Sequence, residues 1–237
     1  MILLKVSCRD GAWLTFNFLY SFMKFKLIYI YDALCTWCYG FSPVIEAVHS
    51  KYKDQFDFEI LSGGMITGTR TGPISVVYSK FKDEYKQVEE ITGIDFGEGF
   101  LHELDKGDMI MDSERPSIAL SVFKSYQPKE AICFAYDLQQ SIYYDGKQPN
   151  NDDLYRYHAV NFGIDPNEFI HKMHLEEFKQ NAYYEFALAR QLQVKNYPAA
   201  FIQTADNHFF MIARGFANLE TMELRIENVL KEIEHKN

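Results

Sequence analysis

The pair Cys35 and Cys38, with two residues between them, constrains the fold more than any other feature of this sequence. The preceding run, 27–31, is β-branched and aromatic without helical period, which predicts a buried strand. From Cys38 to about Lys53 apolar residues recur at three- and four-residue spacing, and the alternating segment 56–61 predicts a second strand. A crossover of this length joins parallel strands, so we expect the cysteines where the first strand gives way to a helix.

The rest of the chain separates a helical middle from a β-containing end. Helical periodicity covers 66–192 without a strand pattern of any strength, and one long helix is expected over about 165–191. Strands return at 199–203 and 209–213 as a hairpin, followed by a helix that Asn218 caps. The order is β-α-β, a helical insertion, then β-β-α. This order predicts an α/β thioredoxin fold with a large all-helical insertion.

The predicted divisions are a thioredoxin-like domain of residues 23–65 and 193–237, an insertion of residues 66–192, and an N-terminal extension of residues 1–22. The apolar run in the extension is too short for a membrane span, and no small-residue cleavage site follows it. We therefore expect the extension not to be native and translation to start at Met23. A signal peptide and an ordered extra segment remain as alternatives. Without a credible signal peptide, the expected location is the cytoplasm.

Composition limits the function classes. The formal net charge of −9 and the lack of a Lys/Arg cluster argue against partners such as nucleic acid or an anionic membrane. Four cysteines in 237 residues are not a disulfide-stapled scaffold. Cys133 lies in an apolar run and is most simply a buried hydrophobe. No metal and no cofactor are expected.

The position of the cysteine pair suits thiol–disulfide exchange. A thiol attacks a disulfide as its thiolate, and the unpaired N–H groups and partial positive charge of a helix N-terminus stabilise that anion. Cys35 would be the exposed attacking thiol and would form a mixed disulfide with the substrate. Cys38, one turn into the helix, would be the more buried thiol that resolves it.

A zinc site and a structural disulfide are the two alternative roles for the pair. A zinc site needs two further ligands, and His171 and His174 are the only other pair with plausible spacing, on a predicted helix. A purely structural disulfide is disfavoured, because a disulfide between cysteines three positions apart at the start of a helix is usually labile and functional.

Pro198 is the second candidate element of the site. In this topology the loop before the third strand lies beside the two cysteines. A cis proline there would present the backbone of Tyr197 to a substrate chain. An ordinary trans proline at the strand entry is the alternative, and the topology favours the cis form.

The segment Cys35-Thr36-Trp37-Cys38-Tyr39-Gly40-Phe41 resembles the DsbA-like branch of the thioredoxin superfamily. The Asp32-x-x-Cys35 lead-in and Ser62-Gly63-Gly64-Met65 are similar to the FrnE-like predicted protein-disulfide isomerases. The resemblance implies dithiol–disulfide exchange, a helical insertion and a cis proline at Pro198. The dipeptide lacks the histidine of the strongly oxidising relatives, so we expect a less oxidising protein.

Residues around the pair are candidates for substrate contact. Trp37 and Thr36 lie between the cysteines, and Tyr39, Met65 and Tyr197 could line an apolar groove. For Trp37 the alternative is packing on its own helix. The expected substrates are protein or small-molecule thiols and disulfides, including glutathione.

Asp32 precedes the pair and has two possible roles. It could relay protons to Cys38, or it could cap nearby backbone at the strand end.

Two other functions on this fold remain open. One is a non-enzymatic adaptor or holdase that docks through the insertion. The other is a glutathione-dependent transferase or isomerase of the kappa type, a class that resembles this fold but carries serine at the position of Cys35. The presence of both cysteines favours redox exchange.

Overall fold

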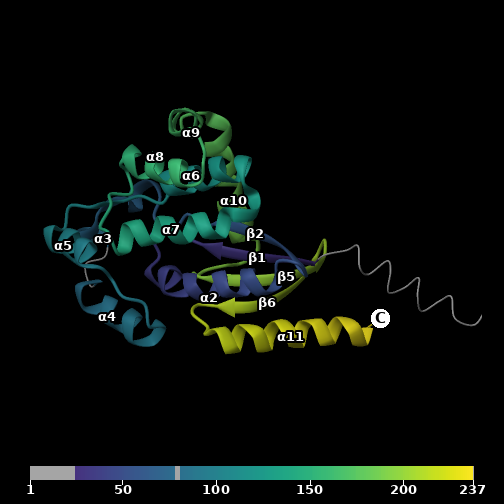
Figure 1. The fold of residues 1–237 in the computed structure, drawn as a ribbon. Coiled ribbons are helices and arrows are strands. Elements are labelled where there is room, and N and C mark those ends of the chain that lie inside the picture. The colour runs from purple at the N-terminus through teal and green to yellow at the C-terminus, as the bar shows by residue number, and fades with distance from the viewer. Residues whose placement is uncertain (1–24, 78–80, 237) are drawn as a thin grey trace, which may run out of the picture.

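The computed structural model describes residues 25–77 and 81–236 (Figure 1). The predicted extension of residues 1–22, and with it the start at Met23, lies outside the described residues. Within them no helix is both long enough and apolar enough to cross a bilayer.

A four-stranded mixed sheet forms the centre of the molecule. Its strands are β1 (Phe25–Tyr31), β2 (Phe56–Ser62), β5 (Ala199–Ala205) and β6 (His208–Arg214), in the spatial order β2-β1-β5-β6. β1 pairs with β2 in parallel and with β5 antiparallel, and β5 and β6 form the hairpin expected from the sequence. The predicted β-α-β, β-β-α order is therefore confirmed.

Alternation along β1 sends its side chains to two different cores. Leu27, Tyr29 and Tyr31 pack in the large core with α2 (Thr36–Tyr52), whereas Ile28 and Ile30 pack in a smaller cluster with Ala189. Ala189 belongs to α10 (Glu176–Gln191), which thus covers the opposite face of the sheet. From Leu27 to Tyr31 β1 is buried on both faces, and this part of the strand is accordingly apolar and aromatic.

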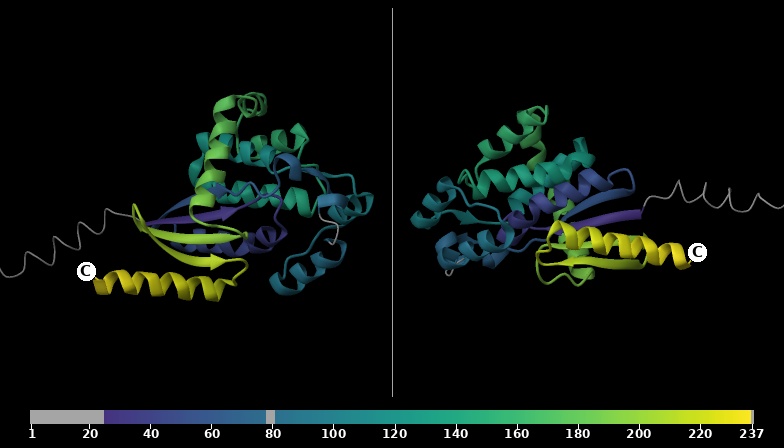
Figure 2. Two further views of the ribbon diagram at one scale, coloured as in Figure 1. Left: turned by 180° about the vertical axis from the view of Figure 1, so that it is seen from behind. Right: turned by 60° about the horizontal axis from the view of Figure 1, so that its bottom comes forward.

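The insertion contributes most of the helices. They are α3 (Ile74–Val77), α4 (Phe81–Thr92), α5 (Glu98–Lys106), α6 (Glu114–Tyr126), α7 (Ala131–Tyr143), α8 (Asp152–Asn161), α9 (Pro166–Met173) and α10, with 3-10 turns η1 (Gly68–Arg70) and η2 (Pro128–Glu130). Figures 1 and 2 show α6 to α10 gathered beyond β2, while the final helix α11 (Leu219–Lys236) lies along β6. Helices α6 to α10 therefore lie toward the β2 edge of the sheet, and α11 lies at the opposite, β6 edge.

The insertion also holds a minute sheet that its helical pattern did not indicate. β3 (Gly72–Pro73) pairs antiparallel with β4 (Ile110–Met111), two residues on each side. A pair this short carries no alternating pattern, so periodicity could not reveal it.

The prediction of a single long helix over about 165–191 is wrong. Asp165 caps α9 as expected, but this helix ends at Met173. Leu175 has an extended backbone and is the N-cap of a separate helix, α10. On a continuous helix Met173 and Phe178 would lie about 140° apart around the axis. The break allows both side chains to be buried, because α9 packs on α6 and α8 while α10 packs on α6 and β2.

A buried ion pair fastens α10 to the sheet. Glu185 is 6% exposed, accepts the Ser62 N–H at 2.8 Å and pairs with Lys124 of α6. Lys124 also donates to the Ile60 carbonyl oxygen at 3.0 Å. The pair thus ties two insertion helices to the end of β2.

We expect Glu185→Ala to lower the free energy of unfolding by about 2–4 kcal/mol, since it leaves the Lys124 ammonium and the Ser62 N–H without their partner. Urea denaturation followed by circular dichroism measures this loss. Glu177→Ala, on the exposed face of the same helix, is the control and should change stability by less than about 0.5 kcal/mol. Equal effects of the two variants would contradict an anchoring role for the pair.

Candidate active site

Cys35 is the N-cap residue of α2. Its backbone is extended, with φ −95° and ψ 113°, and its Sγ accepts the backbone N–H of Cys38 at 3.3 Å. The Cys35 thiol also lies 3.7 Å from the carbonyl oxygen of Tyr197, to which it donates. Both cysteines are unbridged thiols. The Cys35 sulfur is thus held at a helix N-terminus, where unpaired N–H groups favour a negative charge.

Burial distinguishes the two thiols. Cys38 is completely buried, and burial followed by its hydrogen bond and charge interaction with Cys35 holds the pKa of the Cys38 thiol well above its usual range. Cys35 is only 5% exposed, less than its predicted role implied, but it borders an open cavity. Access to the pair is therefore through Cys35.

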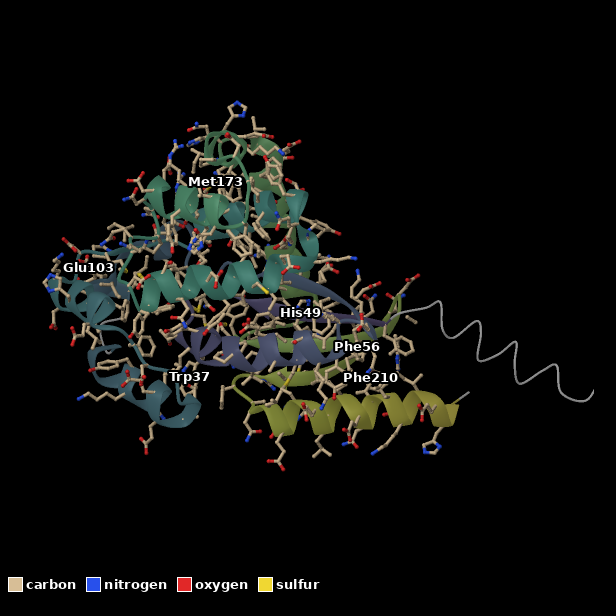
Figure 3. All side chains as sticks on the ribbon, in the orientation of Figure 1. Trp37, His49, Phe56, Glu103, Met173 and Phe210 are labelled. Atoms are coloured by element: carbon tan, nitrogen blue, oxygen red, sulfur yellow. The ribbon has the colours of Figure 1, made fainter. Side chains whose placement is uncertain are left out.

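The cavity beside Cys35 has a volume of about 830 Å³. It is lined by Cys35, Thr36, Trp37, Gly63, Gly64, Met65, Arg70, Gln87, Val88, Ile91, Arg190, Val194, Lys195, Asn196, Tyr197, Gly215 and Phe216. Trp37 is half-buried and points toward α4, as Figure 3 shows, rather than lying on its own helix alone. Of the predicted contact residues, Thr36, Trp37, Met65 and Tyr197 all reach this cavity.

Tyr39 does not reach it. The side chain is fully buried, its hydroxyl donates to the Asp95 carbonyl oxygen at 3.0 Å, and its ring stacks on Tyr143 at 5.2 Å. Tyr39 therefore joins α2 to the insertion, and the structure places it away from any substrate at Cys35.

The loop before β5 completes the mouth of the cavity. The Tyr197–Pro198 peptide bond is cis. The Tyr197 hydroxyl donates to the Gly63 carbonyl oxygen at 2.8 Å, and a side chain on Gly63 would collide with the Tyr197 ring. Burial raises the pKa of Tyr197 to about 12, so this hydroxyl stays protonated and keeps its role as a donor.

Asp32 is buried at the end of β1, just before the cysteine pair, where its carboxylate binds three separate segments of the chain. Its Oδ1 accepts the Leu34 N–H at 3.0 Å and the Ser113 hydroxyl at 2.7 Å, and its Oδ2 accepts the Met65 N–H at 2.7 Å. Burial raises the pKa of Asp32, while these hydrogen bonds oppose the rise. Because both oxygens already accept hydrogen bonds, the capping role predicted for Asp32 fits better than the proton relay.

Several residues of the site were not predicted from the sequence. Gln139 of α7 places its amide nitrogen 3.2 Å from the Asp32 carbonyl oxygen and 3.4 Å from that of Cys35, steadying the loop between strand and helix. Arg70, Arg190 and Lys195 line the cavity without any acidic residue among its lining. No local pattern marks these four, since they come from separate segments.

No group of three or more His, Cys, Asp or Glu side chains suited to a metal ion occurs in the described part of the chain. His171 and His174, weighed above as zinc ligands, are both exposed.

A family model described as Thioredoxin matches residues 28–223, which is most of the chain. The chain belongs to the thioredoxin family. The match spans the cysteine pair, the whole insertion and the hairpin. A search of curated proteins found no match.

Solved structures show which form of the thioredoxin fold this protein has. A candidate protein disulfide isomerase from Nitrosomonas europaea matches with a TM-score of 0.78 and 22% identity, covering 89% of this chain and 99% of that chain. The cytosolic disulfide reductase DsbM from Pseudomonas aeruginosa matches with a TM-score of 0.73 and 19% identity, covering 87% and 98%. 2-Hydroxychromene-2-carboxylate isomerase matches with a TM-score of 0.60 and 11% identity, covering 90% and 99%. These likenesses confirm the predicted DsbA-like fold with its helical insertion.

We predict that iodoacetamide at pH 8 alkylates Cys35 well before Cys38 and Cys133. Burial raises the pKa of Cys38, and burial with nearby Glu130 raises the pKa of Cys133 to about 11, so only about one Cys133 thiol in a thousand is ionised at that pH. Timed alkylation followed by peptide mass spectrometry separates the sites. Raising the pH to 10 should bring up the labelling of Cys133 more than that of Cys35. Labelling of Cys38 as fast as Cys35 would contradict the burial argument.

Proposed function

We propose that this protein is a thiol–disulfide oxidoreductase that acts through a mixed disulfide at Cys35, resolved by Cys38. The observation that carries the proposal is the unequal placement of the two thiols. Cys35 caps a helix at the mouth of a cavity, whereas Cys38 lies beneath it with a raised pKa. This arrangement supports one attacking and one resolving sulfur.

The exchange proceeds in two displacements. The Cys35 thiolate attacks a substrate disulfide, a Cys35–substrate bond forms, and the other substrate sulfur leaves as a thiolate that takes up a proton. Cys38 then loses its proton and attacks the Cys35 sulfur, which releases the second substrate sulfur and leaves a Cys35–Cys38 disulfide. The substrate gains two electrons and the protein loses them. The reverse sequence oxidises a dithiol. If another thiolate of the substrate attacks the Cys35–substrate bond before Cys38 does, a new substrate disulfide forms, Cys35 leaves as a thiolate, and the net result is isomerisation.

The cavity favours a substrate that carries negative charge. Arg70, Arg190 and Lys195 surround it in a chain with a net charge of −9, and its lining contains no acidic side chain. Apolar contact is available from Trp37 and Phe216. We propose that a small anionic disulfide such as that of glutathione binds there. One solved structure of the similar protein DsbM contains glutathione.

The proposed cellular setting is the cytoplasm with the pair at rest as a dithiol. DsbM, whose fold this chain shares, is described as cytosolic and as a reductase. A non-enzymatic adaptor would need no exchange at Cys35, and the next experiment separates that possibility from an enzyme.

We expect the pair to show a reversible two-electron transition between about −270 and −120 mV in glutathione redox buffers. Acid quenching and mass spectrometry count the dithiol and disulfide forms. Cys38→Ser should trap a mixed disulfide with glutathione, while Cys35→Ser should form none because the buried Cys38 cannot reach the substrate. A protein with no transition and no trapped adduct would be an adaptor rather than an oxidoreductase.

The charge of the cavity gives a separate prediction. Arg190→Gln and Lys195→Gln should each slow the reaction with glutathione disulfide by about threefold to tenfold, since each removes attraction for the substrate carboxylates. The reaction with the uncharged 2-hydroxyethyl disulfide should stay within about twofold of the wild type. Lys231→Gln, on the distant helix α11, is the matched control. Equal slowing with both disulfides would contradict recognition by charge.

A further inference from the structure

Gln139 of the insertion helix α7 lies against the turn that carries the two cysteines. Its side chain is 1% exposed, and its Nε2 lies 3.2 Å from the carbonyl oxygen of Asp32. The same nitrogen lies 3.4 Å from the carbonyl oxygens of both Ala33 and Cys35. Two N–H bonds thus face three backbone acceptors in the segment that links β1 to α2.

The other end of the Gln139 amide contacts α2 beyond the cysteine pair. The Ser42 hydroxyl lies 2.7 Å from Gln139 Oε1 and 2.9 Å from the Cys38 carbonyl oxygen, so its single proton is shared between two acceptors. The reverse orientation of the amide would set its oxygen against three carbonyl oxygens that have no proton to donate. One side chain therefore bridges the backbone before Cys35 and the helix turn after Cys38.

The closing of a disulfide between the two cysteines depends on the backbone of Cys35. A disulfide accepts only a narrow range of Cα separations and side-chain directions. Cys35 is an N-cap residue with an extended backbone, so the hydrogen bonds of α2 constrain it less than they constrain Cys38, which lies inside the helix. A contact that holds the Cys35 backbone in place reduces the conformational freedom that the dithiol loses when the bond forms.

We propose that Gln139 is a positioning residue through which the insertion shifts the equilibrium between Cys35 and Cys38 toward the disulfide and speeds the closing step. The inference rests on the proposed oxidoreductase function. In that step Cys38 loses its proton and its sulfur bonds to the Cys35 sulfur, while the bond from Cys35 to the substrate breaks and the released substrate thiolate takes up a proton. Gln139 exchanges no proton with either sulfur. Its N–H groups hold the turn in the geometry that the disulfide needs.

A merely structural role for Gln139 would leave the redox equilibrium unchanged. Removing a contact that is equally strong in the dithiol and the disulfide lowers the free energy of unfolding of both forms by the same amount. The loss shifts the equilibrium between the two forms only if the contact favours one of them. The equilibrium constant with glutathione therefore separates positioning of the pair from general stabilisation.

The matched pair of variants is Gln139→Met and Gln140→Met. Methionine has nearly the length of glutamine but no N–H donor and no carbonyl acceptor. Gln140 is the next residue of α7, where its Nε2 donates to the Tyr136 hydroxyl at 2.8 Å and its Oε1 accepts the Tyr39 hydroxyl of α2 at 3.3 Å. Both changes remove an amide that joins α7 to α2, and only the first removes donors from the turn at Cys35.

The experiment equilibrates the full-length protein with oxidised and reduced glutathione at pH 7, quenches with acid and counts the dithiol, mixed-disulfide and disulfide forms by mass spectrometry. Each Cys35–Cys38 bond that forms converts one glutathione disulfide into two glutathione thiols. We expect Gln139→Met to lower the equilibrium constant for the protein disulfide by about fivefold to tenfold, where tenfold corresponds to about 30 mV toward a more oxidising potential.

A time course from the reduced protein gives the two rates. Gln139→Met should resolve the mixed disulfide about fivefold to tenfold more slowly, yet form it within about twofold of the wild-type rate, because only resolution depends on the placement of Cys35 relative to Cys38. Gln140→Met should stay within about twofold of the wild type in both rates and in the equilibrium constant.

An unchanged equilibrium in Gln139→Met, or an equal shift in Gln140→Met, would overturn the inference and leave the oxidoreductase function standing. If the wild type shows no transition between dithiol and disulfide, both fail together. Should Gln139→Met not fold, Ser42→Ala is the second variant, since it removes the hydroxyl that holds the amide oxygen. Ser42→Ala should lower the equilibrium constant by about twofold to fivefold, and an unchanged constant would overturn the inference.

Discussion

The buried carboxylate of Asp32 joins three segments of the chain around the cysteine pair. It accepts hydrogen bonds from the Leu34 N–H next to the cysteines, from the Met65 N–H after β2, and from the Ser113 hydroxyl at the start of α6. Ser113 in turn accepts the Ile66 N–H at 3.0 Å. A carboxylate with these donors tolerates burial. The Asp32 carboxylate therefore fixes the position of the cysteines relative to both the cavity wall and the insertion.

The two thiols differ in their environment, because the helix N-terminus favours a negative charge on sulfur whereas burial opposes it. The sulfur of Cys35, at the N-cap, accepts a hydrogen bond from the N–H of Cys38 and borders the cavity. Cys38 is one turn further in, and burial outweighs any benefit from the helix terminus, since desolvation is the largest influence on its pKa. A two-residue spacing thus suffices to give adjacent sulfurs different chemistry.

Local patterns were enough to predict the core of the site. The alternation in β1 and the helical spacing after Cys38 are properties of neighbouring residues, so strand, cysteine pair and helix could be placed from sequence. The direction of Tyr39 could not be predicted in this way. Its position next to Cys38 does not determine which face of the helix it lies on, and its ring stacks on Tyr143. Arg70 and Arg190 could not be found, since only the tertiary fold brings them to Cys35.

A similar division runs through the walls of the cavity beside Cys35. Cys35, Cys38 and the Tyr197 loop adjoin the central sheet, whereas Arg70, Ile91 and Arg190 of the cavity wall lie in the helical segment between β2 and β5. Changes in these helices can therefore alter the wall of the cavity beside Cys35 without disturbing the β1–α2 junction. The buried contacts of Asp32 and Gln139 limit this freedom, because they make the insertion also a support for the loop that carries the cysteines.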